Sequence, residues 1–303
     1  MQKLSFPNRI TIELTNKCNV SCTFCPRQNV DMKIGNMDEA LFKKIIDEAA
    51  EFLPVKLVIF FRGESLLHPQ FLEFARYAKN KGLGPIQFAT NAFELDRNIA
   101  DRIIEDESID FISFSLDTLD PDVYKQTRMY GDLKVSMRNV EYLSEKCKEA
   151  KNQGKTVPTL QVSTIEIDDY LNGQDEFIKY WKNKVDIVRV YYEHDDNGKF
   201  RNSLVQSDLE KKINIRKPCR KIFTDLLVFW NGDLALCNYD WRGGLKPLNL
   251  NTLSIREAWN SDLYEKIRCM HNRGVFDDSL MCKECGHWRI DYMDEGFLGK
   301  MYK

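Results

Sequence analysis

Residues 10–191 alternate between short apolar segments and longer segments with helical periodicity. The short segments are rich in β-branched and aromatic side chains and have the length of single strands. The predicted strands are ITIEL at 10–14, VKLVIFF at 55–61, PIQFAT at 85–90, DFISFSLD at 110–117, TLQVSTIEI at 159–167 and VDIVRVYY at 185–192. This alternation is typical of an α/β protein.

The segments between the predicted strands have the spacing of amphipathic helices. In MDEALFKKIIDEAAEFL, for example, the residues that recur at helical intervals are Ala40, Leu41, Ile45, Ala49 and Phe52. Repeated strand–helix units favour parallel strands joined by right-handed crossovers. Because six units are fewer than the eight of a closed barrel, we expect a partial (β/α)6 TIM-like barrel over residues 1–192. Its chemistry is expected at the carboxyl ends of the strands.

The pattern changes in the last third of the chain. Residues 193–218 are polar and are predicted to form a linker. The segment TDLLVFWNGDLALC is a predicted hairpin with a type I′ turn at Asn231 and Gly232. A capping box that begins at Ser254 predicts a short helix. We therefore expect a small second domain at 219–303. It has few apolar residues, so we expect a bound metal or a covalent cross-link to stabilise it.

Composition narrows the range of partners. The chain has 303 residues, 43% of them hydrophobic and 30% charged, which is ordinary for a globular protein. A net charge of -2 offers no basic field for nucleic acid. No apolar segment is long enough to span a membrane, and no signal peptide is recognisable. The nine cysteines then favour a cytoplasmic protein whose clustered thiols bind metal.

Three cysteines lie within eight residues directly after the first predicted strand, in CNVSCTFC. A structural zinc site needs four ligands, and disulfides need an even number of thiols. Three thiolates on one loop suit a 4Fe–4S cluster that leaves one iron open to a substrate or cofactor. The alternative is part of a zinc site that other residues complete. The expected ligands are Cys18, Cys22 and Cys25.

The pattern C-x-x-x-C-x-aromatic-C after the first strand of an α/β barrel resembles the radical S-adenosylmethionine (SAM) superfamily. The resemblance implies that the open iron binds the amino and carboxylate groups of SAM. One electron then cleaves SAM to methionine and a 5′-deoxyadenosyl radical, with a flavodoxin- or ferredoxin-like protein as the expected donor. Phe24 is the aromatic residue of the motif and is expected to contact SAM.

Segments after the next three strands resemble further SAM-binding motifs of this family. FRGESLLHP is similar to the Gly-Gly-Glu-Pro segment that holds the SAM amino group, although Arg62 replaces the first glycine and Ser65 the proline. TNA is similar to Thr-Asn-Gly, and SFSLD matches a Ser-x-Asp ending near the ribose and methionine. The arginine of YKQTR resembles one that pairs with the SAM carboxylate. The residues expected to bind SAM are Gly63, Glu64, Asn91, Ser115, Asp117 and Arg128.

A second set of cysteines lies in the predicted small domain. Two flank the hairpin and two form the pair CKEC, so four thiolates can hold either zinc or a fully ligated 4Fe–4S cluster. The layout resembles the twitch module, a shortened relative of the SPASM module, and implies one auxiliary cluster. The spacing is similar to that of radical SAM dehydrogenases of the 2-deoxy-scyllo-inosamine type, which oxidise aminocyclitol alcohols. The expected ligands are Cys219, Cys237, Cys282 and Cys285.

Two further residues are candidates for the chemistry on the substrate. Arg189 and Tyr191 are expected on one face of the last barrel strand, where Arg189 either assists deprotonation of a substrate hydroxyl or forms a structural salt bridge. Cys269 is either a buried structural thiol or a donor that returns a hydrogen atom to a substrate radical, as in radical SAM epimerases. Cys147 lies in a charged predicted helix and is expected to be structural.

Three functions remain open from the sequence. The preferred hypothesis is a radical SAM oxidoreductase that oxidises an alcohol on a sugar- or cyclitol-like small molecule. The second is a radical SAM epimerase or peptide maturase, and the third is a non-catalytic zinc-binding structural protein. Peptide-modifying relatives often carry a recognition domain before the barrel, whereas the first strand here begins near residue 10. We therefore expect a small-molecule substrate.

Overall fold

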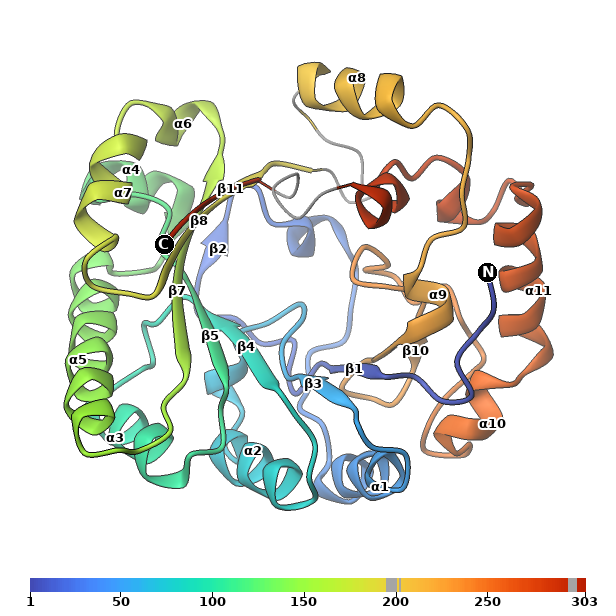
Figure 1. The fold of residues 1–303 in the computed structure, drawn as a ribbon, viewed down its shortest axis with the longest axis horizontal. Coiled ribbons are helices and arrows are strands. Elements are labelled where there is room, and N and C mark those ends of the chain that lie inside the picture. Colours follow the sequence, from blue (N-terminus) through green and yellow to red (C-terminus); the bar gives the residue numbers. More distant parts are fainter. Residues whose placement is uncertain (195–200, 202, 294–298) are drawn as a thin grey trace.

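The computed structural model describes residues 1–194, 201, 203–293 and 299–303. The strands of its main sheet are β1 (Arg9–Ile12), β3 (Lys56–Val58), β4 (Ile86–Thr90), β5 (Phe111–Ser115), β7 (Thr159–Glu166), β8 (Ile187–Tyr192), β9 (Asp225–Val228), β10 (Leu234–Ala235) and β11 (Gly299–Tyr302). They form one curved sheet in the order β10-β9-β1-β3-β4-β5-β7-β8-β11, with most helices of the first two thirds of the chain on its outer side (Figure 1).

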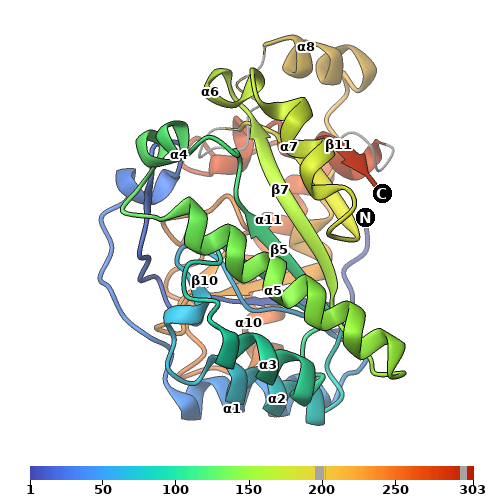
Figure 2. The same ribbon diagram turned by 90° about the vertical axis from the view of Figure 1, so that its left-hand side faces the viewer.

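The strands β1, β3, β4, β5, β7 and β8 are parallel neighbours, which confirms the predicted partial α/β barrel. Helices cover the outer side of these strands, as Figure 2 shows for α5, α3, α2 and α1. The helices of this part are α1 (Glu39–Ala50), α2 (Phe71–Asn80), α3 (Arg97–Asp106), α4 (Pro121–Thr127), α5 (Leu133–Asn152), α6 (Asp168–Leu171) and α7 (Gln174–Trp181). Short 3-10 helices are η1 (Pro26–Asn29) and η2 (Ser65–Leu67).

The hydrophobic core lies between the outer face of the sheet and the helices. Because side chains alternate along a strand, Ile112 and Phe114 of β5 point to this core and are fully buried. The same alternation turns polar side chains such as Ser113, Gln161 and Arg189 to the inner face of the barrel. An inner face with so many polar groups is typical of a ligand site rather than of packed core.

The predicted hairpin is present, but it belongs to the barrel sheet. β9 runs parallel to β1, and β10 pairs antiparallel with β9. The turn is not type I′, because only Gly232 of the predicted pair has a positive φ, of 87°. Its N–H donates to the carbonyl of Phe229 at 2.9 Å, so the loop is three residues long and ends in a left-handed glycine. The capping box at Ser254 is confirmed.

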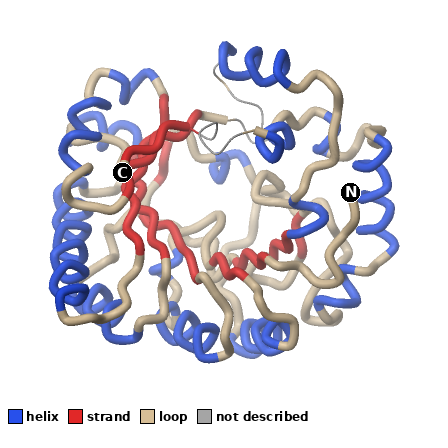
Figure 3. Tube along the Cα trace, in the orientation of Figure 1, coloured by secondary structure: helices blue, strands red, loops and turns tan. Residues whose placement is uncertain are grey.

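The structure adds two elements that the sequence did not predict, one on each side of the hairpin region. The predicted linker contains α8 (Ser203–Lys212), although part of it, 195–200 and 202, lies outside the described residues. β11 pairs antiparallel with β8, so the C-terminal residues return to the barrel, and Figure 3 shows the strands as one curved band. The remaining helices are α9 (Lys221–Thr224), α10 (Ile255–Trp259), α11 (Asp262–Arg273), η3 (Met281–Lys283) and η4 (His287–Tyr292).

The division into domains stays a prediction. Among the described residues, no helix combines the length and apolar character needed to cross a bilayer.

Candidate active site

The loop that carries the first three cysteines leaves the carboxyl end of β1. A small second sheet fastens it, because β2 (Ser21–Cys22) pairs antiparallel with β6 (Arg128–Met129) and places Cys22 opposite Arg128. The N–H of Thr23 also donates to the carbonyl of Thr127 at 2.9 Å. Sequence reasoning missed this pairing, since strands of two residues have no periodicity to detect. The pairing brings the cysteine loop to the arginine expected at the SAM carboxylate.

The three thiols of this loop are free of disulfides. Burial is the main cause that raises the pKa of Cys25 to about 11, and the neighbouring thiols of Cys22 and Cys18 raise it further. Burial likewise raises the pKa values of Cys18 and Cys22. Thiols must ionise to bind metal, so this loop needs the positive charge of bound iron to become a set of thiolates. Three clustered, soft thiol donors fit a 4Fe–4S cluster with one open iron.

Glu64 is a buried carboxylate that follows the second strand of the barrel. It is 3% exposed, and its oxygens accept hydrogen bonds from the N–H groups of Leu66 at 3.2 Å and Asn91 at 2.9 Å. No ion pair of Glu64 is found in the part of the chain that the structure describes. Burial therefore raises its pKa to about 7. A desolvated carboxylate in this state fits the ammonium group of a ligand, as expected for SAM.

Gly63 lets two segments approach at the level of their backbones. A Cβ atom at this position would lie 2.4 Å from the carbonyl oxygen of Lys17 and 2.5 Å from that of Thr15. The next N–H, of Glu64, donates to the same Lys17 carbonyl at 2.7 Å. Glycine is therefore required here by close packing on the cysteine loop, and this packing positions Glu64.

Asn91 connects the cysteine loop with the third motif. Its backbone N–H binds Glu64, and its side-chain amide donates to the side-chain oxygen of Asn19 at 2.7 Å. The following residue, Ala92, has a φ of 62° and occupies the position where the family has glycine. A left-handed alanine is strained by about 1 kcal/mol relative to glycine, so the chain adopts at Ala92 a backbone conformation that glycine would adopt more easily.

Asp117 and Arg128 form an ion pair in the middle of the site. The Nε atom of Arg128 donates to Oδ2 of Asp117 at 2.5 Å, and both side chains are buried. The guanidinium also lies 5.4 Å from the ring of Phe24, which makes an edge contact with Tyr170. Ser115 ends β5 two residues before Asp117. The contact of Arg128 with the SAM carboxylate stays a prediction. In that contact the guanidinium would bind the SAM carboxylate and Asp117 at the same time.

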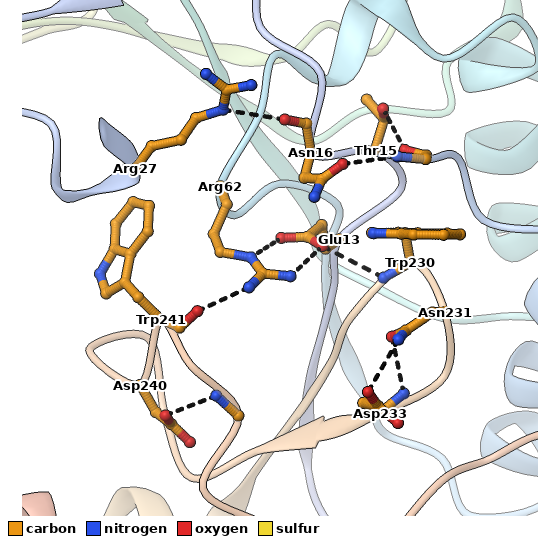
Figure 4. Close-up of polar contacts among 12 residues, drawn as sticks. Glu13, Thr15, Asn16, Arg27, Arg62, Trp230, Asn231, Asp233, Asp240 and Trp241 are labelled. Atoms are coloured by element: carbon orange, nitrogen blue, oxygen red, sulfur yellow. Dashed lines mark hydrogen bonds and ion pairs between the residues drawn. The ribbon is translucent and has the colours of Figure 1, made fainter. Parts of the chain in front are cut away.

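Arg62 stands where the family motif has glycine, and all of its side-chain nitrogens donate to protein acceptors. Its Nε and Nη2 atoms donate to the two carboxylate oxygens of Glu13 at 2.5 and 2.8 Å, and its Nη1 donates to the carbonyl of Trp241 at 2.7 Å (Figure 4). The guanidinium stacks 3.6 Å from the ring centre of Phe229. A carboxylate oxygen of Glu13 also accepts from the N–H of Trp230 at 3.4 Å. This network joins the end of β1 to the hairpin and to the loop after Cys237.

The network was missed from the sequence, although one signal was present. In ITIEL, Glu13 alternates with the apolar residues that face the helices, which places its side chain on the inner face of the barrel. The structure shows that it is completely buried there, and a buried acid needs a partner.

The four thiols of the second set lie close enough to influence one another electrostatically. Burial raises the pKa of Cys237 to about 12, and the nearby Cys285 raises it further. The sulfur of Cys237 accepts from the N–H of Tyr239 at 3.5 Å, and the sulfur of Cys285 accepts from the N–H of His287 at 3.4 Å. Burial also raises the pKa of Cys219. Backbone N–H bonds to sulfur are the contacts that tune iron–sulfur clusters.

Arg216 holds the C-x-x-C turn in place. Its Nη1 and Nη2 atoms donate to the carbonyls of Cys285 and Cys282, both at 3.1 Å. Among the described residues, no three His, Cys, Asp or Glu side chains are grouped tightly enough for a single metal ion. The four buried thiols that influence one another are soft donors, which fit an auxiliary 4Fe–4S cluster.

The three remaining candidate residues, Arg189, Cys269 and Cys147, differ in burial and in their place in the fold. Arg189 is 8% exposed in the middle of β8, on the inner face of the barrel. Cys269 is exposed on α11, away from the buried face of that helix, so the alternative of a buried structural thiol is wrong, and its role as a hydrogen donor stays a prediction. Cys147 is 3% exposed in the core on α5, and burial raises its pKa to about 12, as expected for a structural thiol.

Several characterised or named proteins are similar to parts of the chain. The tungsten-containing aldehyde ferredoxin oxidoreductase cofactor-modifying protein of Pyrococcus furiosus is 33% identical over 36% of this chain. A probable GTP 3′,8-cyclase of Methanocaldococcus jannaschii is 31% identical over 41%, and the mycofactocin maturase MftC of Mycobacterium ulcerans is 29% identical over 46%. The chain spans only 30%, 41% and 37% of these relatives.

Solved structures are similar over most of the chain at low identity. Streptococcus suis SuiB bound to the precursor peptide SuiA matches 95% of this chain and 71% of its own, with 16% identity and a TM-score of 0.68. BtrN in complex with AdoMet and 2-DOIA matches 90% of this chain and 89% of its own, with 18% identity and a TM-score of 0.55. At these identities the likeness confirms the fold alone.

Two family models match the chain itself. The radical SAM superfamily matches residues 12–171, and an iron–sulfur cluster-binding domain of the SPASM family matches residues 219–286. Together they confirm the predicted cofactors, which are SAM, a 4Fe–4S cluster that binds it, and an auxiliary 4Fe–4S cluster. The individual ligand residues stay predictions. With the matched family covering more than half of its length, the chain belongs to the radical SAM superfamily.

Proposed function

We propose that this chain is a radical SAM enzyme that modifies a peptide. The observation that carries the proposal is the extent of its likeness to peptide-bound SuiB, which covers barrel and auxiliary region together, over 95% of the chain. The sequence similarity to a mycofactocin maturase supports the same class. This reverses the order of the hypotheses from the sequence, where alcohol oxidation came first. Clusters with an open iron are oxygen-sensitive, which favours a reducing compartment such as the cytoplasm.

In this proposal, some residues of the site bind SAM and others face the substrate. When bound, SAM and its cluster supply the 5′-deoxyadenosyl radical that takes a hydrogen atom from the substrate. Glu64 binds the ammonium group of SAM, and Arg128 binds its carboxylate beside Asp117. Asn91 and Ser115 line the same end of the barrel, and Phe24 covers it. The polar inner face of β5, β7 and β8 is left for the substrate.

Oxidation of an alcohol is the second candidate. It is supported by the likeness to BtrN, which extends over 90% of this chain and 89% of that one, so the two proteins have nearly the same extent. The single set of four auxiliary thiols suits both candidates, because an auxiliary cluster can take up the second electron when a substrate radical is oxidised. In this reading Arg189 assists the loss of the hydroxyl proton, and a flavodoxin- or ferredoxin-like donor starts each turnover.

The nature of the substrate can be tested without knowing its identity. Reconstituted enzyme is incubated anaerobically with SAM, reductant and a low-mass extract from cells grown in deuterium oxide. We expect deuterium to appear in 5′-deoxyadenosine, and we expect the transfer to be lost when the extract is first treated with a broad protease that is then removed. Transfer that survives proteolysis would contradict the peptide proposal and favour a sugar- or cyclitol-like alcohol.

SAM affinity is expected to depend on pH through Glu64. Burial raises the pKa of this carboxyl group to about 7, so at pH 6 most SAM-free molecules hold it protonated. Because the ammonium group of SAM pairs with the ionised form, we expect affinity to fall as the pH drops below 7, by up to about tenfold per pH unit. The measurement is titration of SAM into reconstituted protein between pH 6 and 8.

The matched control for this pH dependence is Glu64→Gln, which keeps the shape of the side chain without its charge. We expect this variant to bind SAM weakly and with the same affinity across the whole range. A wild-type affinity that stays constant from pH 6 to pH 8, or a variant that keeps the pH dependence, would show that another group binds the ammonium.

A further inference from the structure

Arg189 is one of four arginines that are buried among the described residues, and it differs from the other three. Arg62 binds Glu13 and a carbonyl, and Arg128 binds Asp117. Arg268 donates to the carbonyls of two other segments and to a glutamate of its own helix. By contrast, the side chain of Arg189 makes no hydrogen bond or ion pair in the described part of the chain, and its Nε is completely buried without a partner.

The side chain of Arg189 faces the interior of the barrel. Its neighbours in β8, Val188 and Val190, are fully buried in the core between sheet and helices, so the alternation of the strand places Arg189 on the opposite face. Tyr191 lies on the same face, with its ring 5.4 Å from the guanidinium. The neighbouring strand β7 presents Ser163 opposite Arg189 in the register.

The hydrogen-bonding side chains that the described residues place on the wall beside this guanidinium are neutral. The side-chain amide of Gln161 donates to the hydroxyl of Ser113 at 2.9 Å and to the hydroxyl of Tyr191 at 3.1 Å. These residues come from three adjacent strands and form one polar surface on the inner wall. A buried guanidinium without a counter-charge is costly, and the cost is removed when an anion binds it with two parallel hydrogen bonds.

We propose that Arg189 binds a carboxylate of the substrate, with the hydroxyl of Tyr191 beside it. This inference rests on the proposed function, and it specifies the substrate as a peptide that presents a carboxylate, either its C-terminus or the side chain of Asp or Glu. A planar carboxylate matches the fork of a single guanidinium, and the polar surface of Gln161 and Ser113 then accommodates the adjoining amide. Arg189 is thereby a specificity-determining residue.

Two pairs of small probes test this site and distinguish the two sources of the carboxylate. Acetyl-glycyl-glycine is compared with its C-terminal amide, and acetyl-glutamate amide with acetyl-glutamine amide. Binding is measured by calorimetry on reconstituted protein saturated with SAM, so that the amino-acid site of SAM is already filled. We expect at least one acid to bind roughly tenfold more tightly than its amide, the scale of one charge-assisted contact.

The variant Arg189→Met is expected to bind acid and amide alike. It is also expected to melt at the same temperature as the wild type or higher without a probe, because it removes a buried charge that none of the described residues pairs. Arg62→Met is the matched control, since that guanidinium is paired and its loss should lower the melting temperature. Equal binding of acids and amides by the wild type would overturn the inference. So would an Arg189→Met variant that keeps the preference, or one that melts as low as Arg62→Met.

The binding measurement can fail or succeed separately from the test of the proposed function, because the probes require no turnover. If the acids bind through Arg189 but proteolysis of the extract does not abolish deuterium transfer, the carboxylate site stands and the peptide proposal fails.

Discussion

Replacing Cys18, Cys22 and Cys25 together with alanine is expected to abolish the formation of 5′-deoxyadenosine. The three thiols are grouped on the loop after β1, next to Glu64, Asn91 and Arg128, so their cluster is the one placed to bind SAM. Iron in the reconstituted protein is expected to fall from about eight to about four atoms per chain, because the auxiliary set remains complete. Iron analysis and chromatography of the reaction products give both quantities.

Two other sets of cysteine substitutions separate this effect from general damage. Cys269→Ala removes an exposed thiol outside both sets and should leave about eight irons and normal SAM cleavage. Replacing Cys282 and Cys285 with alanine should also leave about four irons, but with SAM cleavage retained and conversion of the substrate lost. A triple variant of the first loop that still produces 5′-deoxyadenosine would show that the SAM-binding cluster has been assigned to the wrong loop.

The barrel was predictable from the sequence because its strands follow one physical rule. Each strand must bury its outward residues beneath a helix, so residues such as Ile112 and Phe114 stand at alternate positions and mark the strand. The helices are marked in the same way by their buried faces and also by capping aspartates such as Asp38 and Asp96. These signals are local, and they require no knowledge of the rest of the fold.

The elements that were missed depend on contacts between distant segments. β11 finds a partner only because β8 would otherwise be the edge of the sheet, and the hairpin joins the barrel because β1 offers its other edge. The pairing of β2 with β6 involves two residues on each side, too few to leave a pattern. The turn at Asn231 and Gly232 was predicted one residue too short, since composition identifies the glycine but not the loop length.

The candidate site shows the same division between local and distant information. The cysteines and the motifs after the strands could be read in order along the chain, and the structure brings Glu64 and Asn91 to the cysteine loop. The pairing of Arg128 with Asp117, and the lack of a described partner for Arg189, could not be foreseen. Charge balance in a buried site depends on which side chains converge there. The sequence showed that Arg62 stands where the family motif has glycine. What this arginine does became clear only from its partners in the structure, Glu13 and the Trp241 carbonyl.

The substitution Arg62→Met is expected to destabilise the protein by about 3–5 kcal/mol, the usual cost of breaking a buried ion pair by removing one partner. It leaves Glu13 without its ion-pair partner at a fully buried position, and it removes the hydrogen bond to the Trp241 carbonyl and the contact with the Phe229 ring. In thermal unfolding of the reconstituted protein we expect the midpoint to fall by about 5–10 °C. SAM affinity should fall as well, because Gly63 and Glu64 follow Arg62 directly.

A double variant identifies the buried charge as the cause. Glu13→Gln combined with Arg62→Met removes both charges while keeping a side-chain oxygen that can accept from the N–H of Trp230. Replacing a buried ion pair by neutral groups of similar size is often close to neutral, so most of the lost stability should return. The double variant would still lack the link to the Trp241 carbonyl, and its remaining deficit measures that link. If the double variant melts as low as Arg62→Met alone, the contacts of the guanidinium with the hairpin, and not the charge of Glu13, hold the auxiliary region against the barrel.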